Sequence, residues 1–144
     1  MKKTLLIVIV FGLLFGSCKK SNHTPPPTKV TIVGKWQYKK SRSLFMDSQG
    51  TILSEDVIMD YTDNDFVKYN ADGTGQSMLK GSEVNFTYSL SDSTLTQYTL
   101  PRSTGDKPLI FTVFALTVTT FTRHSETFGP GEFRTIRDED FAKF

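Results

Sequence analysis

The feature that most constrains the fold is an alternation of apolar and polar side chains that begins at Val30 and recurs to the end of the chain. Successive side chains of a β-strand point to opposite faces of a sheet, so a period of two is typical of strands with one buried face. Threonine, valine, phenylalanine and tyrosine, which favour strands, dominate the same stretch. No window of about 11 residues carries the spacing of an amphipathic helix. The chain from Val30 onward is therefore predicted to be all-β.

Turn residues divide this stretch into short strands. Asp72-Gly73 lies between two strand-like runs and is the strongest hairpin signal in the chain. The acidic segment 51–65 is less regular and predicts short strands at 51–54 and 57–61. The other predicted strands are 30–43, 66–70, 75–79, 84–90, 94–100, 109–116, 117–128 and 133–138, and the tail 138–144 either extends the last strand or forms a helical turn. About eight strands at this spacing predict a small antiparallel up-and-down β-barrel, whose closure removes exposed edges, with a sandwich as the alternative.

Residues 1–17 have the proportions of a signal peptide that is cleaved from the mature protein. Two lysines precede an apolar run at 5–15, which is shorter than the roughly 20 residues of a membrane-spanning helix. The stretch Leu14-Phe15-Gly16-Ser17-Cys18 resembles a bacterial lipobox, where the signal is cut before a cysteine that then carries lipid, although Phe15 stands where the motif usually has leucine. An ordinary cleaved signal and an uncleaved anchor are the alternatives.

Cys18 is the only cysteine, so no internal disulfide can form, and several acyl chains on it would anchor the protein stably. Residues 18–29 are predicted to link the lipid to a domain at 30–144, because Pro25-Pro26-Pro27 favours an extended, semi-rigid spacer. The acidic run that sends some lipoproteins of Gram-negative bacteria to the cell surface does not follow Cys18. The chain is therefore predicted to be an outer-membrane lipoprotein of a Gram-negative cell envelope that faces the periplasm rather than the surface.

The charge balance argues against a nucleic-acid partner. Removal of residues 1–17 leaves 15 of the 17 basic side chains against 15 acidic ones, so the mature protein is formally neutral and has no basic stripe. The segment 30–144 has the size of one domain with a small core. The predicted partners are the membrane, through the lipid anchor, and a small hydrophobic ligand, and the protein is predicted to be a monomer.

Motifs along the domain resemble those of lipocalins. Gly34-Lys35-Trp36 in the first strand resembles their Gly-x-Trp element, and the segments at 70–74, 88–90 and 115–121 follow in the order seen in small lipocalin-like lipoproteins of Gram-negative bacteria. The resemblance covers roughly 32–127 and implies a lipocalin-like barrel in which Trp36 plugs the closed end. It also implies that a late basic residue, Arg134 or Arg137, packs over this ring as a cation–π partner. The domain is shorter than a typical lipocalin and shows no C-terminal helix.

Residues that could support catalysis or metal binding are scarce. His23 and His124 are the only histidines, and His23 lies in the linker, so a two-histidine zinc site is not available within the domain. Ser125 is adjacent to His124, which points the two side chains to opposite faces of a strand. The acidic residues at 60–65 lack the glycine that a calcium loop needs and predict a solvated loop. We therefore predict no enzyme activity, no metal site and no cofactor.

Aromatic side chains are the remaining candidates for a site, and ordinary core packing is the competing interpretation. The predicted ligand-binding residues are Trp36, Tyr38, Phe86, Tyr88 and Phe111. The first hypothesis is a tethered barrel that binds a small apolar or amphipathic molecule. The second is a filled barrel that binds protein or glycan through its surface, with 55–65 and the loop 101–108 as contact regions. An internal cavity of roughly 300 Å³ or more would favour the first, and an interior filled by aromatic rings would favour the second.

Overall fold

The structure is a computed structural model that describes residues 30–144; the predicted signal peptide, Cys18 and the predicted linker lie outside the described residues. The described residues form nine strands and one short 3₁₀ turn. In chain order these are β1 (Gly34–Met46), β2 (Ile52–Ile58), β3 (Phe66–Tyr69), β4 (Thr74–Leu79), β5 (Ser82–Ser91), β6 (Thr94–Leu100), β7 (Leu109–Leu116), β8 (Thr120–Phe128), η1 (Pro130–Glu132) and β9 (Arg134–Lys143). Within residues 30–144, no helix has the length and apolar character needed to cross a membrane.

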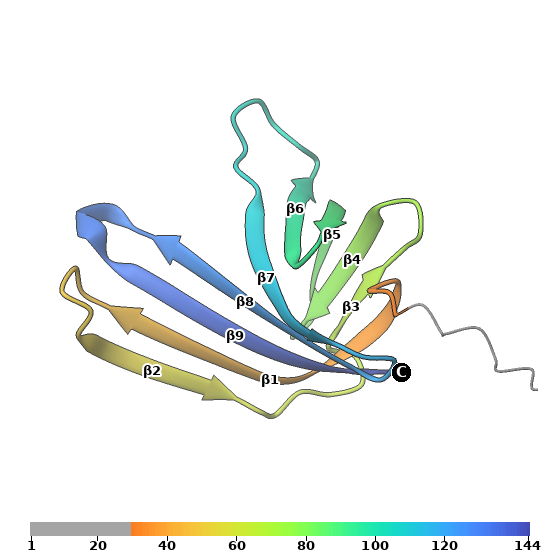
Figure 1. The fold of residues 1–144 in the computed structure, drawn as a ribbon, viewed down its shortest axis with the longest axis horizontal. Helices are drawn as coiled ribbons and strands as arrows, with labels where there is room; N and C mark the ends of the chain where they lie inside the picture. Colours follow the sequence, from red (N-terminus) through yellow and green to blue (C-terminus); the bar gives the residue numbers. More distant parts are fainter. Residues whose placement is uncertain (1–29) are drawn as a thin grey trace, which may run out of the picture.

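The strands pair antiparallel in the order β2-β1-β3-β4-β5-β6-β7-β8-β9, and β9 also pairs with β1 (Figure 1). This pairing closes the sheet, because it runs from Trp36 opposite Lys143 to Met46 opposite Arg134. Eight of the described strands therefore form a closed barrel, and β2 is an additional strand beside β1. The prediction of an all-β, small antiparallel up-and-down barrel of about eight strands is confirmed.

The predicted Asp-Gly hairpin is confirmed as the tight turn between β3 and β4. Gly73 adopts a φ of 83°, which residues with a side chain rarely adopt. Asp72 Oδ1 accepts hydrogen bonds from the backbone N–H of Thr74 at 3.0 Å and from its hydroxyl at 2.7 Å. The backbone N–H of Asn70 donates to the Thr74 carbonyl at 2.8 Å. Local turn chemistry therefore sets the register of these two strands.

Several predicted strands differ in their bounds, and one of the two forms predicted for the tail is confirmed. Residues 52–58 form one strand, β2, instead of two short ones. The tail extends the last strand, which is one of its two predicted forms, so β9 continues to Lys143. Its backbone finds partners on both sides, because β9 lies between β1 and β8. The strand predicted at 117–128 begins at Thr120, since the Thr117 hydroxyl accepts hydrogen bonds from the N–H groups of Thr119 and Thr120 and forms a turn.

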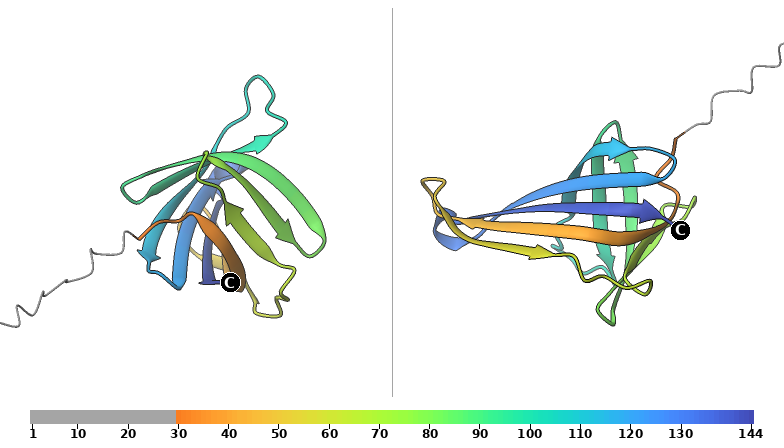
Figure 2. Two further views of the ribbon diagram at one scale, coloured as in Figure 1. Left: turned by 90° about the vertical axis from the view of Figure 1, so that its right-hand side faces the viewer. Right: turned by 90° about the horizontal axis from the view of Figure 1, so that it is seen from below.

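The connections lie alternately at two ends of the barrel (Figure 2). The turns at 70–73, 92–93 and 117–119 share one end with the start of β1 and the end of β9, and we call this the closed end. The connections at 47–51, 80–81, 101–108 and 129–133 belong to the other end, the open end. The first residues of the described chain therefore enter the barrel at its closed end.

Four strands continue beyond the barrel as a separate sheet. β1 and β9 have 13 and 10 residues, whereas β3 and β4 have 4 and 6. The longer strands project past the open end in the order β2-β1-β9-β8, as the right-hand view of Figure 2 shows. We define this projecting sheet as the extension; it comprises residues 42–46, 52–57, 124–128 and 134–138.

Candidate functional site

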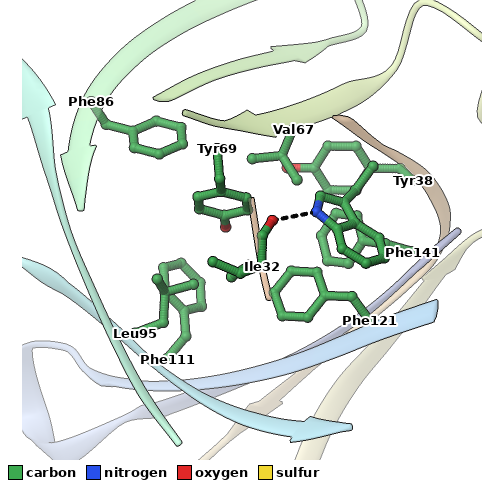
Figure 3. Close-up of a cluster of buried hydrophobic side chains, with 10 residues drawn as sticks. Ile32, Tyr38, Val67, Tyr69, Phe86, Leu95, Phe111, Phe121 and Phe141 are labelled. Atoms are coloured by element: carbon green, nitrogen blue, oxygen red, sulfur yellow. Dashed lines mark hydrogen bonds between the residues drawn. The ribbon is translucent and has the colours of Figure 1, made fainter. Parts of the chain in front are cut away.

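Aromatic side chains occupy the closed half of the barrel. The Tyr69 ring lies at its centre, edge-on to Phe86 with 5.6 Å between ring centroids and edge-on to Phe121 at 6.1 Å (Figure 3). Gly75 lets the Phe86 ring lie directly against β4, because a Cβ at this position would meet the ring at 2.2 Å. The buried cluster, at most 6% exposed, comprises Ile32, Trp36, Tyr38, Val67, Tyr69, Phe86, Leu95, Phe111, Phe121 and Phe141.

Trp36 lies at the closed end and is fully buried. Its indole N–H donates a hydrogen bond of 2.6 Å to the backbone carbonyl of Ile32, drawn as the dashed line in Figure 3. Its ring centroid lies 5.6 Å from that of Phe121. The segment before β1 and the start of β8 thus converge on this single tryptophan.

The prediction that Arg134 or Arg137 packs over the Trp36 ring is wrong. Lys143 Nζ lies 5.1 Å from the Trp36 ring centroid, because the register of β9 places Lys143 opposite Trp36. The same register places Arg134 and Arg137 in the extension. Arg137 Nε donates there to the hydroxyl of Ser43 at 3.3 Å.

The residues predicted to bind a ligand lie together, but they contact one another. Trp36, Tyr38, Phe86 and Phe111 belong to the buried cluster. Tyr88 is half-buried, and its ring packs edge-on to that of Tyr69 at 4.9 Å between centroids. Its hydroxyl donates a hydrogen bond of 2.7 Å to a backbone carbonyl. These rings therefore serve as core packing in the closed half of the barrel.

A buried ion pair lies next to the aromatic cluster. Arg123 Nε on β8 donates a hydrogen bond of 2.6 Å to Glu139 Oε2 on β9, and both side chains are 6% exposed. The other two guanidinium nitrogens donate to the hydroxyls of Tyr69 at 2.8 Å and Tyr38 at 3.3 Å. The guanidinium also lies 4.2 Å from the Phe111 ring centroid. Each nitrogen of this buried cation has a partner, which offsets the cost of removing the charge from water.

Burial and charge have opposite effects on the pKa of Arg123. Burial alone would lower the pKa of the guanidinium, but the Glu139 carboxylate together with Tyr69 and Tyr38 outweighs this effect, so the pKa is raised above its ordinary value. Burial raises the pKa of the Tyr69 phenol and that of the Tyr38 phenol. Arg123 therefore stays charged and both hydroxyls stay protonated at neutral pH. Gln97 Nε2 also donates a hydrogen bond of 2.8 Å to the Tyr69 hydroxyl. We call this group the polar layer; it comprises Arg123, Glu139, Gln97 and the hydroxyls of Tyr69 and Tyr38.

The sequence predictions did not include this polar layer. Its signal was present, because Arg123 is two residues from Phe121 and Glu139 is two residues from Phe141. Side chains two apart in a strand share a face, so each charged residue had to face the interior with its aromatic neighbour. A charged residue in line with the apolar side chains of a strand is predicted to be buried. Two such residues of opposite charge are predicted to form an ion pair.

The open half of the barrel carries inward-facing apolar side chains that remain exposed. Val84 pairs with Ser77, which bonds to the buried Tyr38, and Leu109 pairs with the buried Gln97. Opposed residues share a face of the sheet, so Val84 and Leu109 also point inward. They are 38% and 50% exposed. The mouth of the barrel is therefore partly apolar above a polar layer.

Two surface hollows lie outside the interior of the barrel. One of about 590 Å³ lies under the connection from β2 to β3, where Phe66 and Met78 face outward from the wall. The other, of about 320 Å³, lies at the tip of the extension beside Phe128 and Arg134. Neither hollow is lined by the aromatic residues predicted to bind a ligand.

Asp65 fixes the connection from β2 to β3. Its carboxylate accepts hydrogen bonds from the backbone N–H of Thr62 at 2.8 Å, from the Thr62 hydroxyl at 2.9 Å and from the backbone N–H of Lys80 at 2.6 Å. The bonds from Thr62 and Lys80 lower the pKa of Asp65 below its ordinary value of 3.8. This member of the acidic segment therefore has a structural role.

Because the pKa of Asp65 is lower in the folded chain than in the unfolded chain, its contribution to stability should be complete above about pH 4 and be lost as the pH falls through the lowered value. We expect Asp65→Asn to reduce the free energy of unfolding at pH 7 by about 1–3 kcal/mol. It should also flatten the loss of stability in acid, measured by urea unfolding with circular dichroism. The same amide substitution at the exposed neighbour, Asp63→Asn, is the matched control, and an acid slope in Asp65→Asn as steep as that of the parent would contradict the assignment.

The outer face of the extension has an apolar centre crossed by ion pairs. Leu44 on β1 lies opposite Ile136 on β9 and is 8% exposed. Arg42 Nε lies 2.8 Å from Glu55 Oε1 across β1 and β2, and Arg134 Nε lies 2.6 Å from Glu126 Oε1 across β8 and β9. Large exposed apolar side chains surround this centre; they are Ile52, Leu53, Val57 and Phe128.

The inner face of the extension is lined mainly by hydroxyl groups. At its tip, the ring of Phe45 stacks on that of Phe133 with 5.3 Å between centroids. The hydroxyl-bearing residues that share this face by register are Ser43, Ser54, Ser125, Thr127 and Thr135. The two faces of the extension therefore differ in chemistry, and both are open to solvent.

The structure places His124 and Ser125 on opposite faces of β8. His124 pairs with Asp138 and Ser125 pairs with Arg137, and His124 Nδ1 lies 2.7 Å from Asp138 Oδ1 on the outer face. The Phe114 ring covers His124, with 5.3 Å between ring centroids. Among residues 30–144, no group of three or more histidine, cysteine, aspartate or glutamate side chains is arranged to hold a metal ion.

The fold and its interior define a small closed β-barrel whose closed half is packed with aromatic side chains and whose open end carries a projecting sheet. A scan against protein-family models finds no match to this chain, and neither does a search of curated proteins. Function has therefore to be inferred from the residues and their geometry.

Proposed function

We propose that this chain is a non-enzymatic lipoprotein, held at the periplasmic side of a Gram-negative outer membrane through lipid on Cys18, whose barrel is a rigid scaffold that presents the extension to a protein partner. The lipobox-like residues before Cys18 and the proline-rich segment after it support the tether. Residues 1–29 lie outside the described structure, so this part of the proposal rests on sequence.

One observation carries the proposed interaction role. The closed half of the barrel is occupied by the aromatic residues that a ligand pocket would have needed, whereas the extension exposes large apolar side chains on a sheet with no cover. Val57 is 46% exposed and Phe128 is 73% exposed. Exposed apolar groups gathered on one surface are typical of protein-binding sites. The segment 55–65, one of the two contact regions in the interaction-module hypothesis, belongs partly to this surface.

A small-molecule binding role is the second candidate. It is favoured by Val84 and Leu109, which point into the mouth of the barrel and stay exposed. An apolar or amphipathic molecule could cover these side chains above the polar layer of Arg123 and Gln97. Native mass spectrometry of the lipidated protein in mild detergent separates the two roles. A reproducible extra mass of a few hundred daltons that organic solvent strips would favour this candidate.

Site-specific photo-crosslinking in living cells tests the proposed interaction role. A photoreactive phenylalanine analogue would replace Val57 or Phe128 in the extension, and Asn85 as the matched exposed position. Asn85 lies on β5, which is opposite β9 in the ring of eight barrel strands. We expect both extension positions to crosslink to the same protein and Asn85 to give no such product. Equal products from all three positions, or none from the extension, would refute the role.

A further inference from the structure

The outer edge of β2 is a strand edge without a partner in the described structure. β2 lies at one end of the strand order and pairs with β1 alone, from Ile58 opposite Ser41 to Ile52 opposite Met46 (Figure 1). Six of its seven residues are exposed. Such an edge presents a row of backbone N–H and C=O groups that can pair with another extended chain.

The side chains along this edge define the chemistry of a suitable partner. The segment 52–65 contains five acidic residues and no lysine or arginine. Glu55 and Asp56 lie side by side in the middle of β2, and Asp60 and Asp63 follow at exposed positions. Leu53 and Val57 flank the central acidic pair and are 51% and 46% exposed. Arg42 Nε on β1 lies 2.8 Å from Glu55 Oε1, so Asp56 is the member of this pair with no ion-pair partner among residues 30–144. The edge therefore combines a partly compensated negative centre with apolar sites on either side.

A second copy of this chain fits the edge poorly. The antiparallel register that pairs all seven residues of β2 with those of another β2 would place Glu55 opposite Glu55 of the second copy. Like charges directly opposite each other destabilise a strand pair. A chain with positive charges at the centre would instead gain attraction at this position.

We propose that β2 is a strand-addition site for an extended segment of a partner protein with two neighbouring lysine or arginine residues flanked by apolar ones. This inference rests on the proposed interaction role and names the surface and the partner chemistry. Neighbouring residues of the added strand point to opposite faces, as Glu55 and Asp56 do, so one basic side chain meets Asp56 and the other meets Glu55, which Arg42 also contacts. Backbone hydrogen bonds hold the added strand, and Leu53 and Val57 contact its apolar residues.

Acidic residues on an edge strand also have a plainer role, which is to keep other strands away. The two roles predict opposite results. If the acidic pair only guards the edge, a basic extended peptide should bind no better than an acidic one. If the pair selects a partner, the basic peptide should bind and the acidic one should not.

The test uses the full chain in detergent and two synthetic peptides. One peptide has two central lysines flanked by valine and threonine, and in the other the lysines are replaced by glutamates. Fluorescence anisotropy should show the lysine peptide binding at least about tenfold more tightly. Asp56→Lys should weaken its binding about tenfold or more, whereas Glu83→Lys, the same charge change at an exposed position of β5, should leave it unchanged.

Hydrogen exchange followed by NMR distinguishes strand addition from loose charge attraction. In a strand, successive N–H groups point to opposite edges, so the lysine peptide should slow the exchange of alternate amides of β2 only. Failure of the lysine peptide to bind, binding that ignores Asp56→Lys, or protection elsewhere would overturn the proposal. If position 128 crosslinks to a protein but the lysine peptide does not bind, strand addition is rejected and the proposed interaction role stands. If neither crosslinks nor peptide binding are found, both proposals are rejected.

Discussion

Replacing Arg123 with methionine is expected to lower the free energy of unfolding by about 3–5 kcal/mol. The variant leaves the Glu139 carboxylate, which is 6% exposed on its side chain, without its cation at 2.6 Å. The hydroxyls of Tyr69 and Tyr38 also lose the hydrogen bonds that Arg123 donates to them. Urea unfolding followed by circular dichroism at pH 7 measures the change.

The double variant Arg123→Met/Glu139→Leu is the control for this effect. It removes both charges and leaves side chains of similar volume, so it should be more stable than Arg123→Met alone. The two substitutions share one interaction and should therefore be strongly non-additive. If the double variant instead loses the sum of the two single losses, the ion pair is not the coupled unit that the geometry indicates.

Trp36→Ala is the second large effect and should cost about 3–5 kcal/mol. The substitution removes a fully buried indole, its hydrogen bond to Ile32 and its contact with Phe121. Trp36 is the only tryptophan, so unfolding has to be followed by circular dichroism rather than by tryptophan fluorescence.

Trp36→Phe gives a graded comparison at the same site. It keeps an aromatic ring but loses the N–H that donates to the Ile32 carbonyl, so its loss of stability should be clearly smaller than that of Trp36→Ala. A cost under about 1 kcal/mol for Trp36→Ala would show that this end of the barrel tolerates an empty site, contrary to its role as the plug.

The barrel was predictable from sequence where one face of a strand is buried. In the first strand, Trp36 and Tyr38 alternate with polar residues because only their face meets the core. The turn at Asp72-Gly73 was predictable because its conformation depends on local residues. The clustering of the predicted aromatic residues followed from the same alternation.

The extension was not predictable, because neither of its faces packs against the core of the barrel. β2 has both faces in solvent, so Ile52 and Leu53 stand together, as do Glu55 and Asp56, and the period of two disappears. The cation that packs over Trp36 was also not predictable, because it depends on the register between β1 and β9. This register places Lys143 opposite Trp36 and places Arg134 and Arg137 in the extension. Register between strands far apart in sequence leaves no local signal.

The pairing of β1 with β9 also governs how the chain can fold. Trp36 meets Lys143 across this seam, so the barrel cannot close until its last strand has joined its first. Contacts between such distant segments form slowly, because a long loop must be ordered before they contribute. Until then, β1 and β9 each keep an unpaired edge, which makes the incomplete chain prone to aggregation. A chain that lacks its final strand would therefore remain an open, aggregation-prone sheet with unpaired strand edges.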